Sequence, residues 1–120
     1  AVLQSLSLLF KYDGHEETLR KAEQAIELAQ SDMAPVDAIE TLGQGWVGEE
    51  ALGIGIYAAL EGRDFSEAVR IGANHTGDSD STASIAGQLY GAWHGLNGMP
   101  EEWIEALDIH DIINGLLKKT

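Results

Sequence analysis

Apolar residues recur at the spacing of an α-helix along most of this 120-residue chain, and no segment alternates like a β-strand between turn signals. Residues 16–30 show the period most clearly, since their charged side chains all fall on the face opposite the apolar one. The apolar face of this segment is formed by Leu19, Ala22, Ile26 and Ala29. Further helices are expected over residues 36–42, 46–61, 64–73, 81–95, 100–107 and 108–119. The chain is therefore predicted to be all-α.

Some helix ends can be predicted from single residues. Asp64 is a favourable N-cap, and Glu67, three residues later, completes a capping box. Pro100 suits the first turn of a helix. Lys118 and Lys119 lie at the end of the last predicted helix, where positive charge complements the helix dipole.

Glycine is unusually frequent inside these predicted helices, although each interior glycine costs about 1 kcal/mol relative to alanine. Gly87, Gly91 and Gly95 are spaced four residues apart and so share one ridge, while Gly53 and Gly55 lie inside the helix predicted before them. The compensation expected for this cost is close packing of a neighbouring helix. We therefore expect the ridge of three glycines to face another helix at short distance.

Composition excludes several classes of protein and partner. The chain has 7 basic and 20 acidic residues, a formal net charge of −13, which disfavours nucleic acid and anionic membrane surfaces as partners. It has no cysteine, so thiolate metal sites and disulfides are excluded, and a cytoplasmic location is expected. Residues 1–10 are apolar but have neither the basic start nor the cleavage site of a signal peptide. The absence of a first methionine leads us to expect that the chain begins inside a longer protein.

The segment GQGWVG places Gly43, Gly45 and Gly48 in the order of a dinucleotide-binding fingerprint. That fingerprint requires a buried strand before it, and residues 37–42, DAIETL, are not one. A glycine-rich loop before a helix can still present backbone N–H groups to an anionic ligand. Trp46 could stack on a base, or it could be a core residue at a helix entry.

The segment HTGDSDST, residues 75–82, places two carboxylates two positions apart immediately before a helix. An EF-hand is excluded, because counting from Asp78 puts Ala83 at position six and Leu89 at position twelve.

Two interpretations of this segment remain. A helix cap needs one acceptor side chain, which Ser79 or Asp80 could supply. Asp78, Asp80 and Ser81 together offer three hard oxygen donors suited to Mg²⁺, Mn²⁺ or Ca²⁺, with the remaining ligands supplied by water, substrate or other residues.

Both motifs, in their order and spacing, resemble the C-terminal part of the ADP-ribosylglycohydrolase family. The resemblance rests on GQGWVGEEAL from residue 43 and on residues 65–103, which end in Pro-x-x-Trp. Members of this family are all-helical enzymes that remove ADP-ribose from modified proteins and related conjugates. The resemblance implies a compact orthogonal multi-helix bundle and a hydrolase acting on an N- or O-glycosidic bond.

The resemblance also implies a role for particular residues. Asp78, Asp80 and Ser81 would ligate part of a pair of divalent cations, Mg²⁺ or Mn²⁺. Gly43, Gly45 and Trp46 would line the cleft for ADP-ribose. The partner would be an ADP-ribosylated protein or another ADP-ribose conjugate.

One part of the family's pattern is missing. The other metal ligands of the family, a Thr-Asp-Asp cluster, and its catalytic acidic residue lie in an N-terminal half, and this sequence has no Thr-Asp-Asp. Residues 1–120 are therefore expected to be the C-terminal portion of one helical domain, to need the N-terminal half of the same protein, and to be inactive alone. The catalytic residue stays unassigned. A non-catalytic module that binds ADP-ribose or a nucleotide, and a structural protein on the same fold like some lens crystallins, are the alternatives.

Overall fold

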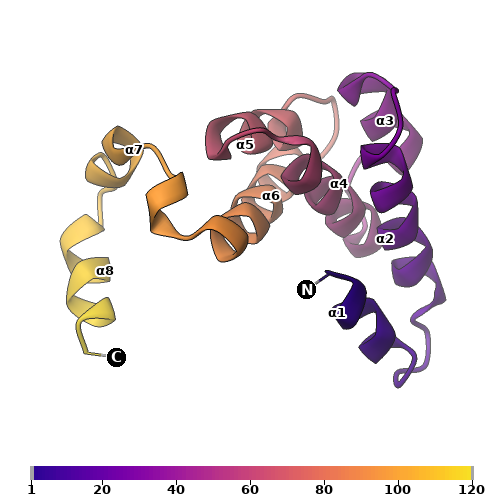
Figure 1. Cartoon of the computed structure of the whole chain (residues 1–120), viewed down its shortest axis with the longest axis horizontal. Coiled ribbons are helices and arrows are strands. Elements are labelled where there is room, and N and C mark those ends of the chain that lie inside the picture. The colour runs from indigo at the N-terminus through magenta and orange to yellow at the C-terminus, as the bar shows by residue number, and fades with distance from the viewer. Residues whose placement is uncertain (1, 120) are drawn as a thin grey trace.

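The computed structural model describes residues 2–119, which fold into helices joined by short loops and contain no β-strand (Figure 1). The all-α prediction is confirmed. In chain order the helices are α1 (Val2–Leu9), α2 (Glu16–Ala29), α3 (Pro35–Leu42), α4 (Gly48–Glu61), α5 (Phe65–Ala73), α6 (Ser79–His94), the 3₁₀ turn η1 (Leu96–Gly98), α7 (Glu101–Glu105) and α8 (His110–Leu117).

Helix α4 is the centre of the bundle and packs most extensively against α2 and α6, while α5 packs against α6. Its sequence, GEEALGIGIYAALE, is apolar on nearly every face, as expected for a helix surrounded by others. The main core cluster includes Ala22, Ala25, Leu42, Ile54 and Tyr57, all fully buried. The predicted apolar face of residues 16–30 therefore covers α4, and its charged face is exposed to solvent.

A close approach between α4 and α6 lies at Gly55 and not along the predicted glycine ridge. A Cβ atom on Gly55 would overlap Ile85 of α6 and lie 2.8 Å from the Ile85 Cβ. By contrast, a Cβ on Gly87 would make ordinary contacts of 3.5 Å with side chains of α5, and one on Gly91 would meet only the flexible end of Met99. Gly95 has open space around it and ends α6 with a φ of +73°. The expectation for the ridge was wrong, because the spacing of glycines does not show which ones face a helix backbone.

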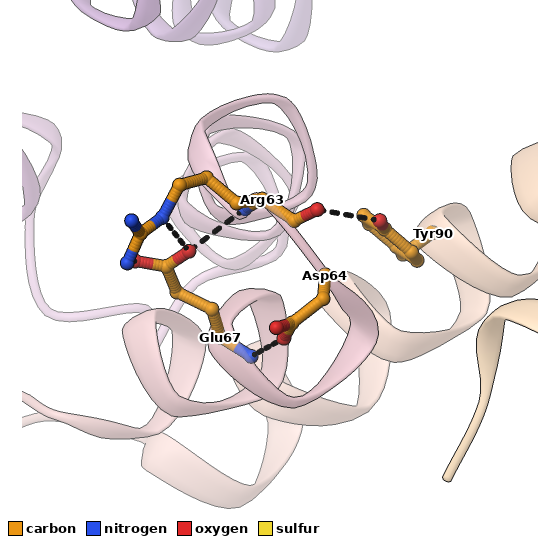
Figure 2. A network of polar contacts seen from close by, with 4 residues as sticks. All are labelled: Arg63, Asp64, Glu67 and Tyr90. Carbon is orange, nitrogen blue, oxygen red and sulfur yellow. Dashed lines mark hydrogen bonds and ion pairs between the residues drawn. The ribbon is translucent and has the colours of Figure 1, made fainter.

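Figure 2 shows the start of α5, where the predicted cap is formed with one difference. The Asp64 carboxylate accepts a hydrogen bond of 2.8 Å from the Glu67 backbone N–H, as predicted. The Glu67 carboxylate instead accepts from the N–H of Arg63, one residue before the cap, and pairs with the Arg63 guanidinium. The Tyr90 hydroxyl donates to the Arg63 carbonyl and so joins α6 to this turn.

The two ends of the chain lie at the periphery of the bundle (Figure 1). Helix α1 was not expected from the periodicity, and α7 ends before Leu107. Helix α7 contacts the bundle through the edge-to-face pair of Trp103 and Phe65, while α8 projects beyond it. Within residues 2–119, no helix has the length and apolar character needed to cross a membrane.

Candidate functional site

The acidic residues of HTGDSDST lie where the loop after α5 enters α6. Asp78 occupies the N-cap position of α6 but makes no side-chain capping hydrogen bond. The Ser79 hydroxyl donates to the His75 carbonyl, at 3.0 Å, and so does not cap the helix either. Asp80 and Ser81 follow in the first turn and are exposed, whereas Asp78 is half-buried. A cap made by Ser79 is therefore not formed, whereas the Asp80 carboxylate accepts from the backbone N–H groups of Asp80 and Ser81 in the first turn of α6.

The two carboxylates of this segment, which we call the acidic loop (residues 78–81), lie side by side. A hydrogen bond with the Asp78 side chain, followed by hydrogen bonds from the backbone N–H groups of Asp80 and Ser81, lowers the pKa of Asp80. Two adjacent carboxylates and a hydroxyl make a set of hard oxygen donors suited to a divalent cation. Within residues 2–119, no group of three or more His, Cys, Asp or Glu side chains gathers to hold a metal. The three donors of the acidic loop are fewer than the six oxygens that surround an octahedral cation, so other groups would have to complete such a site.

The second predicted motif forms a tight loop between α3 and α4, which we call the glycine–tryptophan loop (residues 43–46). Gly43 and Gly45 have φ values of +125° and +82°, a region that favours glycine. Gly45 is buried, and a Cβ there would lie 2.8 Å from the Thr82 methyl group of α6. Trp46 is 67% exposed, and its indole N–H donates to the Gln44 side-chain oxygen at 3.1 Å. It is therefore not a core residue, and its ring is available to a ligand.

Two backbone N–H groups of this loop are already bonded within the protein. The backbone N–H groups of Gln44 and Gly45 do not face an open anion site, because both donate to Oε1 of Glu50, at 3.2 and 3.3 Å. The Glu50 carboxylate fills the space beside Gly43 that a side chain would occupy. An acidic side chain of α4 thus satisfies these two donors.

The two loops are in direct contact. The backbone N–H of Asp78 donates to the carbonyl of Gln44 at 2.8 Å. Gly77 lies against the same carbonyl, so that a Cβ on Gly77 would overlap the Gln44 oxygen. The structure therefore brings the predicted metal donors and the predicted substrate-binding residues together at one place.

A buried network behind the acidic loop fixes its entry. The N–H of Gly77 donates to Nδ1 of His75, so the neutral His75 ring carries its proton on Nε2 and donates to the Thr82 hydroxyl at 2.7 Å. Thr82 is fully buried, and its hydroxyl donates to the Gly72 carbonyl at 2.5 Å. This network connects α5, the acidic loop and α6.

A groove of about 330 Å³ lies between α3, the start of the glycine–tryptophan loop and residues 75–77, which precede the acidic loop. Its apolar wall comes from α3, and its polar wall comes from backbone and side chains of the two loop segments. Its lining residues are Val36, Ile39, Glu40, Gly43, Gln44, His75, Thr76 and Gly77. Of the predicted site residues, Gly43 lines this groove, whereas Trp46, Asp78, Asp80 and Ser81 do not.

Sequence reasoning found the residues with recognisable chemistry and missed those that position them. The sequence indicates for Glu50 only a solvated or capping residue in the first turn of a helix, and it assigns no role to His75 or Thr82. Glu50 stands in the first turn of a helix, where an acidic residue is ordinary. Only the fold shows that its carboxylate turns back to the loop before α4.

Comparison with known proteins covers the whole chain at the family level and part of it at the level of individual relatives. A sequence model of the ADP-ribosylglycohydrolase family matches residues 1–120. An ADP-ribosylarginine hydrolase Tri1 of Pseudomonas putida is 41% identical over 47% of this chain and 15% of its own length. An uncharacterised protein of Archaeoglobus fulgidus is 32% identical over 87% of this chain and 36% of its own length. The ADP-ribosylhydrolase ARH1 of Dictyostelium discoideum is 38% identical over 52% of this chain and 17% of its own length.

The matched part is thus a small share of each of these relatives, between 15% and 36% of their length. No solved structure is significantly similar to the chain. The family match nevertheless extends from the first residue to the last and includes both loops. The chain belongs to the ADP-ribosylglycohydrolase family.

Proposed function

We propose that residues 1–120 form part of a metal-dependent hydrolase that breaks the N- or O-glycosidic bond between ADP-ribose and a modified protein side chain or related conjugate. The observation that supports this proposal best is the contact between the two loops through Asp78 and Gln44. It brings the loop that carries hard oxygen donors into contact with the loop that carries an exposed aromatic ring. The names of relatives such as the Tri1 ADP-ribosylarginine hydrolase of P. putida make an arginine conjugate the first substrate to test.

In this proposal each loop has its own task. Asp78, Asp80 and Ser81 hold one side of a site for two divalent cations, Mg²⁺ or Mn²⁺. The bound cations would supply charge stabilisation and orient the ribose and a water. Trp46 stacks on the substrate, and Gly43 and Gly45 shape the cleft around it. The remaining cation ligands and the catalytic acid come from outside residues 1–120, and so this segment alone is expected to be inactive.

The test incubates the full-length protein with an ADP-ribosylated arginine peptide and measures the release of free ADP-ribose by chromatography. Release is expected with Mg²⁺ or Mn²⁺ and not in EDTA. Asp80→Ala should lower kcat/KM by more than about 100-fold, because it removes a cation ligand. Trp46→Ala should mainly raise KM, by about tenfold, because stacking acts on the ground and transition states alike.

Two results would contradict the proposal. Turnover that persists in EDTA, or in Asp80→Ala, would place the chemistry elsewhere. Tight retention of ADP-ribose with no release from arginine, serine or other conjugates would identify a binding module in place of a hydrolase.

A further inference from the structure

We infer that Glu50 is a positioning residue that holds the glycine–tryptophan loop in register with the acidic loop. The inference rests on the proposed function, because it assigns Glu50 a role in shaping that site. It concerns a residue outside both loops, on the first turn of α4.

Glu50 contacts the loop that precedes its own helix. Oε1 of Glu50 accepts from two consecutive backbone N–H groups, those of Gln44 and Gly45. The carboxylate also occupies the space beside Gly43 that any other residue's side chain would fill. Glycine at position 43 is therefore needed for Glu50 to reach the loop.

One peptide group transmits this contact to the acidic loop. In the peptide between Gln44 and Gly45, the N–H donates to Glu50 and the C=O accepts from the N–H of Asp78. A peptide group is planar, so these two hydrogen bonds leave opposite edges of one rigid unit. Rotation of this unit that breaks the bond to Glu50 also turns the carbonyl away from Asp78.

Two simpler roles do not account for the contacts of Glu50. An acidic residue in a first turn stabilises its helix through the dipole wherever its carboxylate points. Glu49 satisfies that role equally well, yet its side chain makes no hydrogen bond or ion pair with the described residues. A cation ligand is the other simple role, and Glu50 does not join Asp78 and Asp80 in a group of three within residues 2–119. Its two backbone contacts are what distinguish Glu50.

The experiment compares Glu50→Ala, Glu50→Gln and Glu49→Ala in the full-length protein. Glu50→Gln loses the charge but keeps the acceptor oxygen, and Glu49→Ala loses the same charge from the same turn. Hydrogen exchange of the Asp78 and Gly45 amides is measured by NMR, and Mn²⁺ affinity is measured by electron paramagnetic resonance. Neither measurement needs turnover.

For Glu50→Ala we expect exchange about 2- to 10-fold faster at both amides, with core amides unchanged. We also expect Mn²⁺ binding about tenfold weaker, the usual effect of losing a residue that orients metal ligands. Glu50→Gln should remain within about threefold of the parent in both measurements, as should Glu49→Ala. Gly77→Ala, which pushes the Gln44 carbonyl away from the other side, should reproduce the Glu50→Ala result with Glu50 still present.

Three results would overturn the inference. The first is unchanged exchange at Asp78 in Glu50→Ala, the second is equal loss in Glu49→Ala, and the third is equal loss in Glu50→Gln. If Glu50→Ala fails to fold, Glu50→Gln and Gly77→Ala still decide the question. A parent protein that neither binds Mn²⁺ nor releases ADP-ribose would contradict the proposed function, while the exchange at Asp78 would still test the role of Glu50.

Discussion

Replacing each of the two glycines inside α4 by alanine is expected to change the free energy of unfolding in opposite directions. Gly53 and Gly55 are both buried in this helix and are two residues apart. A Cβ on Gly53 would find its nearest atoms at 3.4 to 3.5 Å, which is ordinary contact with α2 and α3. A Cβ on Gly55 would overlap Ile85 and lie 3.4 Å from the backbone nitrogen of Ala86. The surroundings of the two positions differ, although their helical environment is the same.

The magnitude follows from two terms. Replacing glycine by alanine inside a helix stabilises it by about 0.5–1 kcal/mol, and this term is common to both sites. Overpacking in a core costs about 1–3 kcal/mol, and it applies only at Gly55, because the β-branched Ile85 has one preferred χ1 rotamer in a helix and cannot turn aside. Gly53→Ala should therefore raise the free energy of unfolding by about 0.5–1 kcal/mol. Gly55→Ala should lower it by up to about 2.5 kcal/mol, the difference of the two terms.

Urea unfolding of the full-length protein, followed by circular dichroism, measures both changes. Adding Ile85→Ala to Gly55→Ala should cost less than the sum of the two single changes, because the two side chains occupy the same space. Equal effects of Gly53→Ala and Gly55→Ala, or a more stable Gly55→Ala, would refute the packing assigned to α4 and α6.

Three further predictions concern groups around α4 and α5. Tyr57→Phe should leave the free energy of unfolding unchanged or raise it by about 1 kcal/mol, which thermal melting checks. The fully buried Tyr57 hydroxyl has no hydrogen-bond partner among the described residues, and burial raises the pKa of Tyr57 to about 12. Asp64→Ala should lower the free energy of unfolding by about 1 kcal/mol through loss of the α5 cap, whereas Ala on the exposed Arg63 should change melting much less. The hydrogen bonds from Arg63 lower the pKa of Glu67. The stability that the ionised Glu67 carboxylate contributes is therefore present at neutral pH and is lost as the pH falls below the ordinary range of a glutamate. The difference in melting temperature between the parent and Glu67→Gln should shrink from pH 7 to pH 3.

Helix content and caps were predictable from the sequence because they depend on neighbours along the chain. The period of residues 16–30 gave α2, and Asp64 gave the start of α5. Helix α1 was not predicted, since residues 2–9 have no charged residue and their polar residues are only Gln4, Ser5 and Ser7, which mark a polar face weakly.

Contacts across the fold were not predictable in the same way. The spacing of Gly87, Gly91 and Gly95 indicated a packing ridge, but Gly55 is the residue at the crossing. The two loops were found as separate motifs, while the bond that joins them uses the carbonyl of Gln44, a backbone atom that every residue has. Backbone partners of this kind leave no trace in residue identity.

The measurement that tests the central claim most directly is the position of Mn²⁺ in crystals of the full-length protein, located by its anomalous scattering. We predict an anomalous peak at the acidic loop, with oxygens of Asp78, Asp80 and Ser81 at about 2.0–2.2 Å from the ion. The peak should be absent from crystals of an Asp78→Asn, Asp80→Asn variant grown under the same conditions. A peak elsewhere, with the acidic loop empty at saturating Mn²⁺, would contradict the account.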